Sequence, residues 1–206
     1  MFVRPVSLAV LAGALMLTAC GSGDKTAAPA AETETAAAPD PVAAEAPEAV
    51  PVAFDLTQVP ISTVELGDFP YVLVTPGYEV RYDKTMDLAA FPIWTGAAFQ
   101  VVEGRVYMAN SRTPDGKEYS RLEFERGMEN AIKAAGGVRI ASSVAPNTVI
   151  EDLPSTLRDD MRLGIGPVYG NPITAYVIRR ADRTVWIQVV SDSSDAAWTV
   201  IDAPNG

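Results

Sequence analysis

The sequence contains no histidine. This absence excludes the Ser-His-Asp and Cys-His arrangements that activate a nucleophile in many hydrolases. It also excludes zinc sites that are built on imidazole ligands. Within residues 53–206 no serine lies three residues before a lysine, so the usual local signature of a lysine-activated serine is missing from the predicted domain as well. The sequence therefore offers none of the commonest constellations for nucleophilic catalysis.

Cysteine occurs once, as Cys20, directly after Leu17, Thr18 and Ala19. An uncharged stretch precedes it and Arg4 precedes that stretch, which is the pattern of a signal peptide over residues 1–19. The apolar part is too short to cross a bilayer, which needs about 20 residues. A lone cysteine can also be a small buried hydrophobic residue, but that explanation fits this position poorly.

Residues 17–20 resemble the lipobox of bacterial lipoproteins. In that class the cysteine thiol receives diacylglycerol, the peptide bond before it is cut, and the new amino group is usually acylated, for example with palmitate. The resemblance implies a lipid anchor on Cys20 and leaves no thiol for a disulfide. Gly21 rather than Asp follows the cysteine, so the inner-membrane retention signal of enterobacterial lipoproteins is absent. We therefore expect the protein to be anchored in the outer membrane, at its periplasmic face.

Positive charge is scarce: Lys and Arg number 16 against 26 Asp and Glu, for a formal net charge of -10. No cluster of Lys and Arg provides the electrostatic footprint of a nucleic-acid-binding protein. An anionic lipid surface would repel such a chain, so the lipid on Cys20 has to hold the protein at the membrane. Nucleic acid is thus not an expected partner.

Residues 20–52 contain no aromatic residue and consist largely of Ala, Pro, Glu and Thr. Such a composition cannot bury enough surface to offset the entropy of ordering, so we expect a disordered tether. A flexible chain of about thirty residues spans roughly 30 Å. The predicted organisation is a signal peptide over 1–19, the acylated cysteine and tether over 20–52, and one periplasmic domain over 53–206.

The clearest predicted element in that domain is a helix over residues 121–135. Ser120 and Glu123 form a capping box, and Tyr119 and Phe124 form a hydrophobic staple. Apolar residues recur at helical spacing and define one buried face. Gly136 is expected to end the helix by adopting a left-handed backbone conformation. The residues of that face are Phe124, Met128, Ala131, Ile132 and Ala135.

Short apolar runs bounded by turn residues predict the strands. Residues 185–190 alternate with period two, which is typical of a sheet with one buried face. The expected fold class is α+β, with a single antiparallel-rich sheet packed against one main helix. Expected strands cover 71–74, 138–141, 173–179, 184–191 and 197–201; a hairpin turning at Glu103-Gly104 covers 97–111, a packed loop 91–96, and a short helix capped by Ser155 covers 155–162.

Several segments together resemble a known family. They are Val102 to Tyr107, Glu129 to Gly137, Ala175 to Ile178, and Val185 to Val189. The chain is similar over residues 69–200 to the N-terminal region that precedes the peptidoglycan-binding domain of many OmpA-family outer-membrane proteins. That following domain binds diaminopimelate through an Asp and an Arg, and no residue of this sequence matches them. The resemblance therefore gives no support for peptidoglycan binding.

Glu125 and Glu129 lie one turn apart on the predicted helix and could bind a cation or act as an acid-base pair. Arg121 and Lys133 flank them at the same spacing, which is typical of a solvated helix face. Residues 164–170 lack the Lys-Ser/Thr of a phosphate loop, and residues 192–195 lack the ligand spacing of a calcium loop. We expect no metal and no cofactor.

The aromatic residues offer the remaining candidates for a binding site. Trp186, Trp198 and Tyr176 could form a platform for a sugar or peptide, although such residues are more often core. Trp94 lies in an expected loop and is the exposed aromatic that we expect to bind a partner. The sequence thus predicts a non-catalytic binding or scaffolding module anchored in the outer membrane, with another envelope protein as its partner. An envelope-acting enzyme with a carboxylate pair is the alternative.

Overall fold

The structure, a computed structural model, describes residues 54–166 and 168–205. The predicted signal peptide, the lipobox residues Leu17, Thr18, Ala19 and Cys20, and the tether lie outside the described residues. The described part forms one six-stranded antiparallel sheet in the order β1-β2-β6-β5-β4-β3. The predicted α+β class with a single antiparallel sheet is confirmed. The strands are β1 (Glu79–Trp94), β2 (Phe99–Arg112), β3 (Val138–Val144), β4 (Pro172–Arg179), β5 (Arg183–Ser191) and β6 (Ala196–Pro204).

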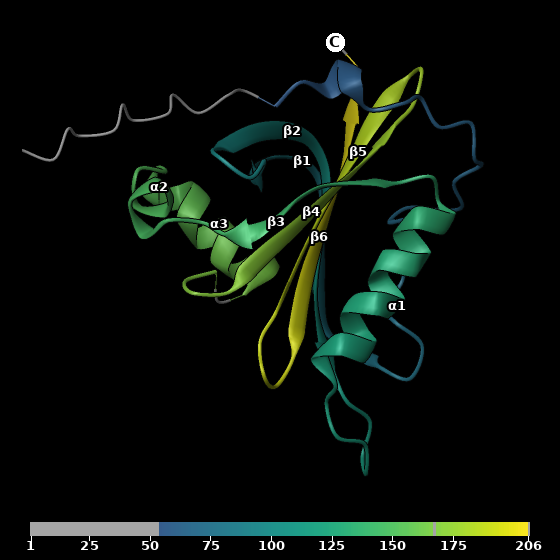
Figure 1. Cartoon of the computed structure of the whole chain (residues 1–206), viewed down its shortest axis with the longest axis vertical. Helices are drawn as coiled ribbons and strands as arrows, with labels where there is room; N and C mark the ends of the chain where they lie inside the picture. Colours follow the sequence, from purple (N-terminus) through teal and green to yellow (C-terminus); the bar gives the residue numbers. More distant parts are fainter. Residues whose placement is uncertain (1–53, 167, 206) are drawn as a thin grey trace, which may run out of the picture. The chain divides into compact units, whose positions relative to one another are not determined.

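Helices cover both faces of the sheet, as Figure 1 shows with the strands seen nearly edge-on. Helix α1 (Arg121–Ala134) lies on one face, whereas α2 (Asn147–Glu151) and α3 (Ser155–Ile165) lie on the other. The side chains of β5 accordingly belong to two apolar clusters, Ile187 to the one beneath α1 and Trp186 to the one beneath α3. The prediction that only one face of this strand is buried is wrong, because β5 is a central strand covered on both sides.

Helix α1 forms as the local signals predict, except that Ala131 of the predicted buried face is exposed. The Ser120 side chain accepts a hydrogen bond from the Glu123 amide, and Phe124, Met128 and Ile132 are fully buried against the sheet. The capping box is only half formed, because the Glu123 carboxylate bonds Tyr78 and Lys117 instead of the Ser120 amide. Amphipathic spacing and an N-terminal cap therefore account for the position of this helix.

The predicted hairpin over residues 97–111 is wrong, because β2 runs through it as one strand. Gly104 does not make a turn there: a Cβ at this position would lie 2.4 Å from the Asp202 carbonyl oxygen of β6. The glycine permits a close approach of two backbones. The turn lies earlier, between β1 and β2, where Gly96 adopts a φ of +97°.

Strand β1 was not predicted, and two expected elements nearby are also corrected. Residues 91–96 are largely the end of β1 rather than a loop, and residues 71–74 form no strand. The end of β1 lies against the face of the sheet opposite α1, where the Gln188 side chain meets it. The Gln188 amide donates to the Pro92 carbonyl and accepts from the Trp94 amide, at 2.8 and 2.7 Å. Pro92 is tolerated because β1 is an edge strand.

Residues 138–144, 172–179, 183–191 and 196–204 are strands, which confirms the remaining strand predictions. The helix predicted over 155–162 extends to Ile165, and its N-cap is Pro154 without a side-chain cap, not Ser155. Helix α2 was not predicted; it spans only five residues.

Residues 54–78, here called the N-terminal arm, are attached to the sheet through Arg179 and Asp202. Arg179 donates to the carbonyls of Thr57 and Val59, at 3.1 and 3.0 Å. Further along the arm, the Tyr71 hydroxyl donates to Asp202. These charge-assisted bonds fix the arm to β4 and β6. None of the described arm residues lines the space between α1 and β3.

Candidate binding groove

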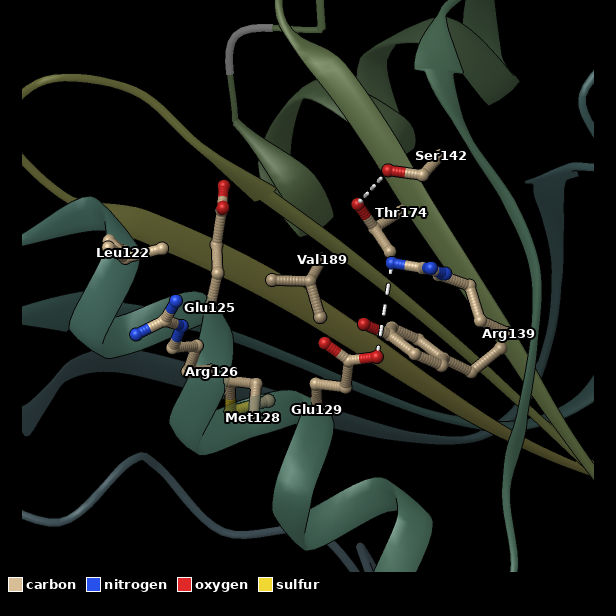
Figure 2. Close-up of a pocket in the computed structure, with 10 residues that line it drawn as sticks. Leu122, Glu125, Arg126, Met128, Glu129, Arg139, Ser142, Thr174 and Val189 are labelled. Atoms are coloured by element: carbon tan, nitrogen blue, oxygen red, sulfur yellow. Dashed lines mark hydrogen bonds and ion pairs between the residues drawn. The ribbon is translucent and has the colours of Figure 1, made fainter.

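A groove of about 190 Å³ runs between α1 and the neighbouring part of the sheet. It arises because β3, among the described residues, contributes no side chain to the apolar cluster beneath α1. The helix therefore covers the middle of that face and leaves the β3 side open. Figure 2 shows the lining, which comes from α1, β3, β4 and β5. The lining residues are Leu122, Glu125, Arg126, Met128, Glu129, Arg139, Ser142, Thr174, Tyr176 and Val189.

The helix side of the groove carries two carboxylates, and each is held by a cation one turn away. The Arg121 Nε lies 2.8 Å from the Glu125 carboxylate, which also accepts a hydrogen bond from the Ser191 hydroxyl. The Lys133 Nζ lies 2.7 Å from the Glu129 carboxylate. Their i,i+4 spacing on the helix produces both pairs, as the sequence predicts.

The sheet side of the groove presents hydrogen-bond donors. Arg139 projects from β3 toward Glu129 but stays 3.9 Å from its carboxylate, the longest ion pair among the described residues. The hydroxyls of Ser142 and Thr174 lie 3.0 Å apart, and one donates to the other, so that one O–H remains for a ligand. Donors on one wall and paired carboxylates on the other make the groove suited to a ligand that brings a carboxylate.

Two titratable groups of the groove, Glu129 and Tyr176, have pKa values that are moved away from neutral pH. The Lys133 hydrogen bond lowers the pKa of Glu129 from its ordinary value of 4.5, despite some opposing desolvation. Burial, followed by the nearby Glu129 charge, raises the pKa of Tyr176 to about 12, so its hydroxyl stays protonated. An acid-base catalyst needs a pKa near the working pH. Neither of these two groups meets that requirement.

Removing the Lys133 amine is expected to return the pKa of Glu129 toward 4.5. The folded-state pKa of this carboxylate lies below its unfolded value. Its ion pair therefore stabilises the domain above the unfolded pKa, and the contribution is lost as pH falls through the folded pKa. Carboxyl carbon NMR on wild type and Lys133→Ala measures the shift, with Lys84→Ala as a distant control. An unchanged Glu129 titration in Lys133→Ala would contradict the assignment.

Trp94 does not present a surface to a partner, which corrects the sequence prediction. It is 1% exposed, its Nε1 donates to the Ser143 hydroxyl at 2.9 Å, and its ring lies against Phe99 with centroids 5.1 Å apart. The preceding Phe91 and Ile93 are also fully buried. The apolar run signals a core strand end, which the neighbouring Pro92 and Gly96 made resemble a loop.

The other sequence candidates resolve as structural residues. Trp186, Trp198 and Tyr176 are all buried, so they form core and not an aromatic platform, although Tyr176 also lines the groove. The Asp192 carboxylate accepts hydrogen bonds from the backbone amides of Ser194 and Asp195. These bonds define a turn between β5 and β6, as predicted. Across residues 54–166 and 168–205, no three His, Cys, Asp or Glu side chains are placed to hold a metal ion.

The groove residues Arg139, Ser142 and Thr174 were missed from the sequence because they form no motif. Their signal is weak: polar side chains interrupt two otherwise apolar strands, which indicates a sheet face left uncovered. Glu125 and Glu129 were found, and the structure places them along the same groove.

Comparison with family models and with curated proteins assigns no family to this α+β domain with its open groove. No family model matches the chain, and no curated protein matches it. The likeness to the OmpA-family N-terminal region therefore remains a prediction. Among the described helices, none has the length and apolar character required to cross a bilayer.

Proposed function

We propose that this chain is a lipoprotein anchored in the outer membrane whose α+β domain is a non-catalytic binding or scaffolding module of the cell envelope. The motif at Leu17 to Cys20 supports the anchor. The observation that carries the binding role is the groove beside α1, where each carboxylate is held by its own cation and donors line the opposite wall. The partner is another envelope protein.

The alternative function is an enzyme with a carboxylate pair, and the arrangement of Glu125 and Glu129 does not favour it. Such a pair needs environments that push the two pKa values apart, with one acid protonated at the working pH. Glu125 and Glu129 instead share the same kind of cationic partner, and the pKa of Glu129 is lowered. The arrangement favours fixed recognition over proton transfer.

Photo-crosslinking in intact cells tests the binding role. A photoreactive amino acid at Leu122, which is 57% exposed at the groove, is expected to capture a specific envelope protein. Leu163 on α3 is 53% exposed and lies on the other face, so it serves as the matched control. Identical products from both positions, or none from Leu122, would argue against a binding module at this groove.

The Cys20→Ser variant is expected to lose the lipid and to leave the outer-membrane fraction. Serine keeps the size of the side chain but removes the thiol that the lipid modifies in lipoproteins. Fractionation and immunoblotting compare it with wild type and with Gly21→Ala, which keeps the cysteine. A Cys20→Ser chain that remains in the outer membrane to the wild-type extent would refute the lipid anchor.

A further inference from the structure

The two edges of the sheet differ in how well they resist pairing with another chain. Strand β1 carries five charged residues between Glu79 and Asp87 and two irregularities in its register, at Val80/Tyr82 and at Met86/Ala89. Charges and bulges are the devices by which edge strands avoid adding a further strand. The far end of β1 is occupied by the Gln188 amide. The β1 edge is therefore guarded in its charged part and at its far end.

Strand β3 carries fewer of these devices, namely one irregularity in its register, at Arg139/Ala141, and one charged residue. It has seven residues, no acid and one basic residue, Arg139, and it begins and ends with exposed valines, Val138 and Val144. Among the described residues its ladder pairs only with β4, so its outer backbone groups have no strand partner. The N-terminal arm pairs at Ile61 with Arg179, beyond the start of β3, and leaves the strand itself open.

The groove and this open edge are adjacent, because Arg139 and Ser142 belong to both. A strand added beside β3 would lie about 4.8 Å away, with alternate side chains on the α1 side of the sheet. Those side chains would sit opposite Arg139 and Ser142, within reach of cross-strand contacts. An extended segment would thus fill the groove edge with side chains and satisfy the backbone of β3 in one step.

We infer that the partner contributes an extended peptide segment that adds to the edge of β3 and places an acidic side chain against Arg139. This inference rests on the proposed binding function and names the partner's chemistry. Glu129 already has Lys133 at 2.7 Å, whereas Arg139 is 3.9 Å away, so Arg139 can take a carboxylate from the partner without leaving Glu129 unpaired. A basic side chain at the same place would meet the guanidinium and be repelled.

Selection from random peptides of about seven residues, the length of β3, tests this on the full chain purified in detergent. Enriched peptides are expected to share one acidic position flanked by residues that favour strands. The charge swap Arg139→Glu should turn that preference to Lys or Arg, and should weaken binding of the original peptides roughly tenfold or more. The matched control Arg81→Glu, an exposed arginine on the β1 edge, should keep the acidic preference.

Amide hydrogen exchange on the best peptide complex locates the added strand. Protection is expected in β3, and methylation of alternate peptide amides should abolish binding because it removes the ladder donors. The inference fails if no peptide is enriched or if Arg139→Glu leaves the acidic preference unchanged. It also fails if the peptide protects the amides of β1 instead of β3, or if the protection of β3 comes from a second copy of this chain. Should peptides fail while Leu122 still captures an envelope protein in cells, the binding function stands and only the extended-segment inference falls.

Discussion

Replacing Trp94 by alanine is expected to lower the free energy of unfolding by about 3 to 5 kcal/mol, which is typical of a buried tryptophan truncated to alanine. The ring is 1% exposed and packs in the cluster beneath α3. Its loss leaves a cavity at the end of β1 and removes the Nε1 donor of Ser143. Urea unfolding of the full chain, followed by circular dichroism, measures the difference.

The matched control is Leu88→Ala, in the same strand but 77% exposed. Its effect is expected to stay within about 0.5 kcal/mol, as is usual for a surface substitution. Equal losses in the two variants would mean that the end of β1 does not pack on the sheet. A stable Trp94→Ala chain that loses its partner would instead restore Trp94 as a binding residue.

Ile132→Ala is expected to destabilise the domain by about 2 to 5 kcal/mol. The side chain is fully buried between α1 and the sheet, in a cluster with Met128 and Trp198. The free energy falls because apolar surface is lost and because the helix cannot move inward to close the cavity. Chemical unfolding monitored by circular dichroism gives the value.

The control on the same helix is Glu129→Ala, which removes an ion pair with Lys133 at the groove. A solvent-accessible pair of this kind contributes less than about 1 kcal/mol. The ratio between the two variants tests the face assignment of α1. Comparable losses would show that the helix is rotated from its described orientation.

Elements defined by neighbours in sequence were predictable. Helix α1 follows from the Ser120 cap, the spacing of Phe124, Met128 and Ile132, and the stop at Gly136, whose φ is +82°. All of these signals lie within a few residues of one another, because helix hydrogen bonds are local. The short strands β3 to β6 are likewise framed by turns, so apolar runs located them.

Strand β1 could not be predicted from its own residues. Its first half is charged and exposed, and its last four residues are buried, so neither half alternates as a half-buried strand does. The strand exists because β2 pairs with it and because Gln188, 94 residues away, satisfies Trp94. Contacts at that separation depend on the whole fold. The misplacement of Trp94 on the surface has the same origin.

The sequence alone determined that histidine chemistry is excluded and that α1 must present one apolar face, since both depend on composition and local spacing. Only the tertiary structure decided which side of α1 stays uncovered. Arg139, Ser142 and Thr174 become groove residues because β3 pairs with β4 at the edge of the sheet, where β3 contributes no side chain to the apolar cluster beneath α1. A helix covers few strands, and the strand order that sets which ones is a property of long-range pairing.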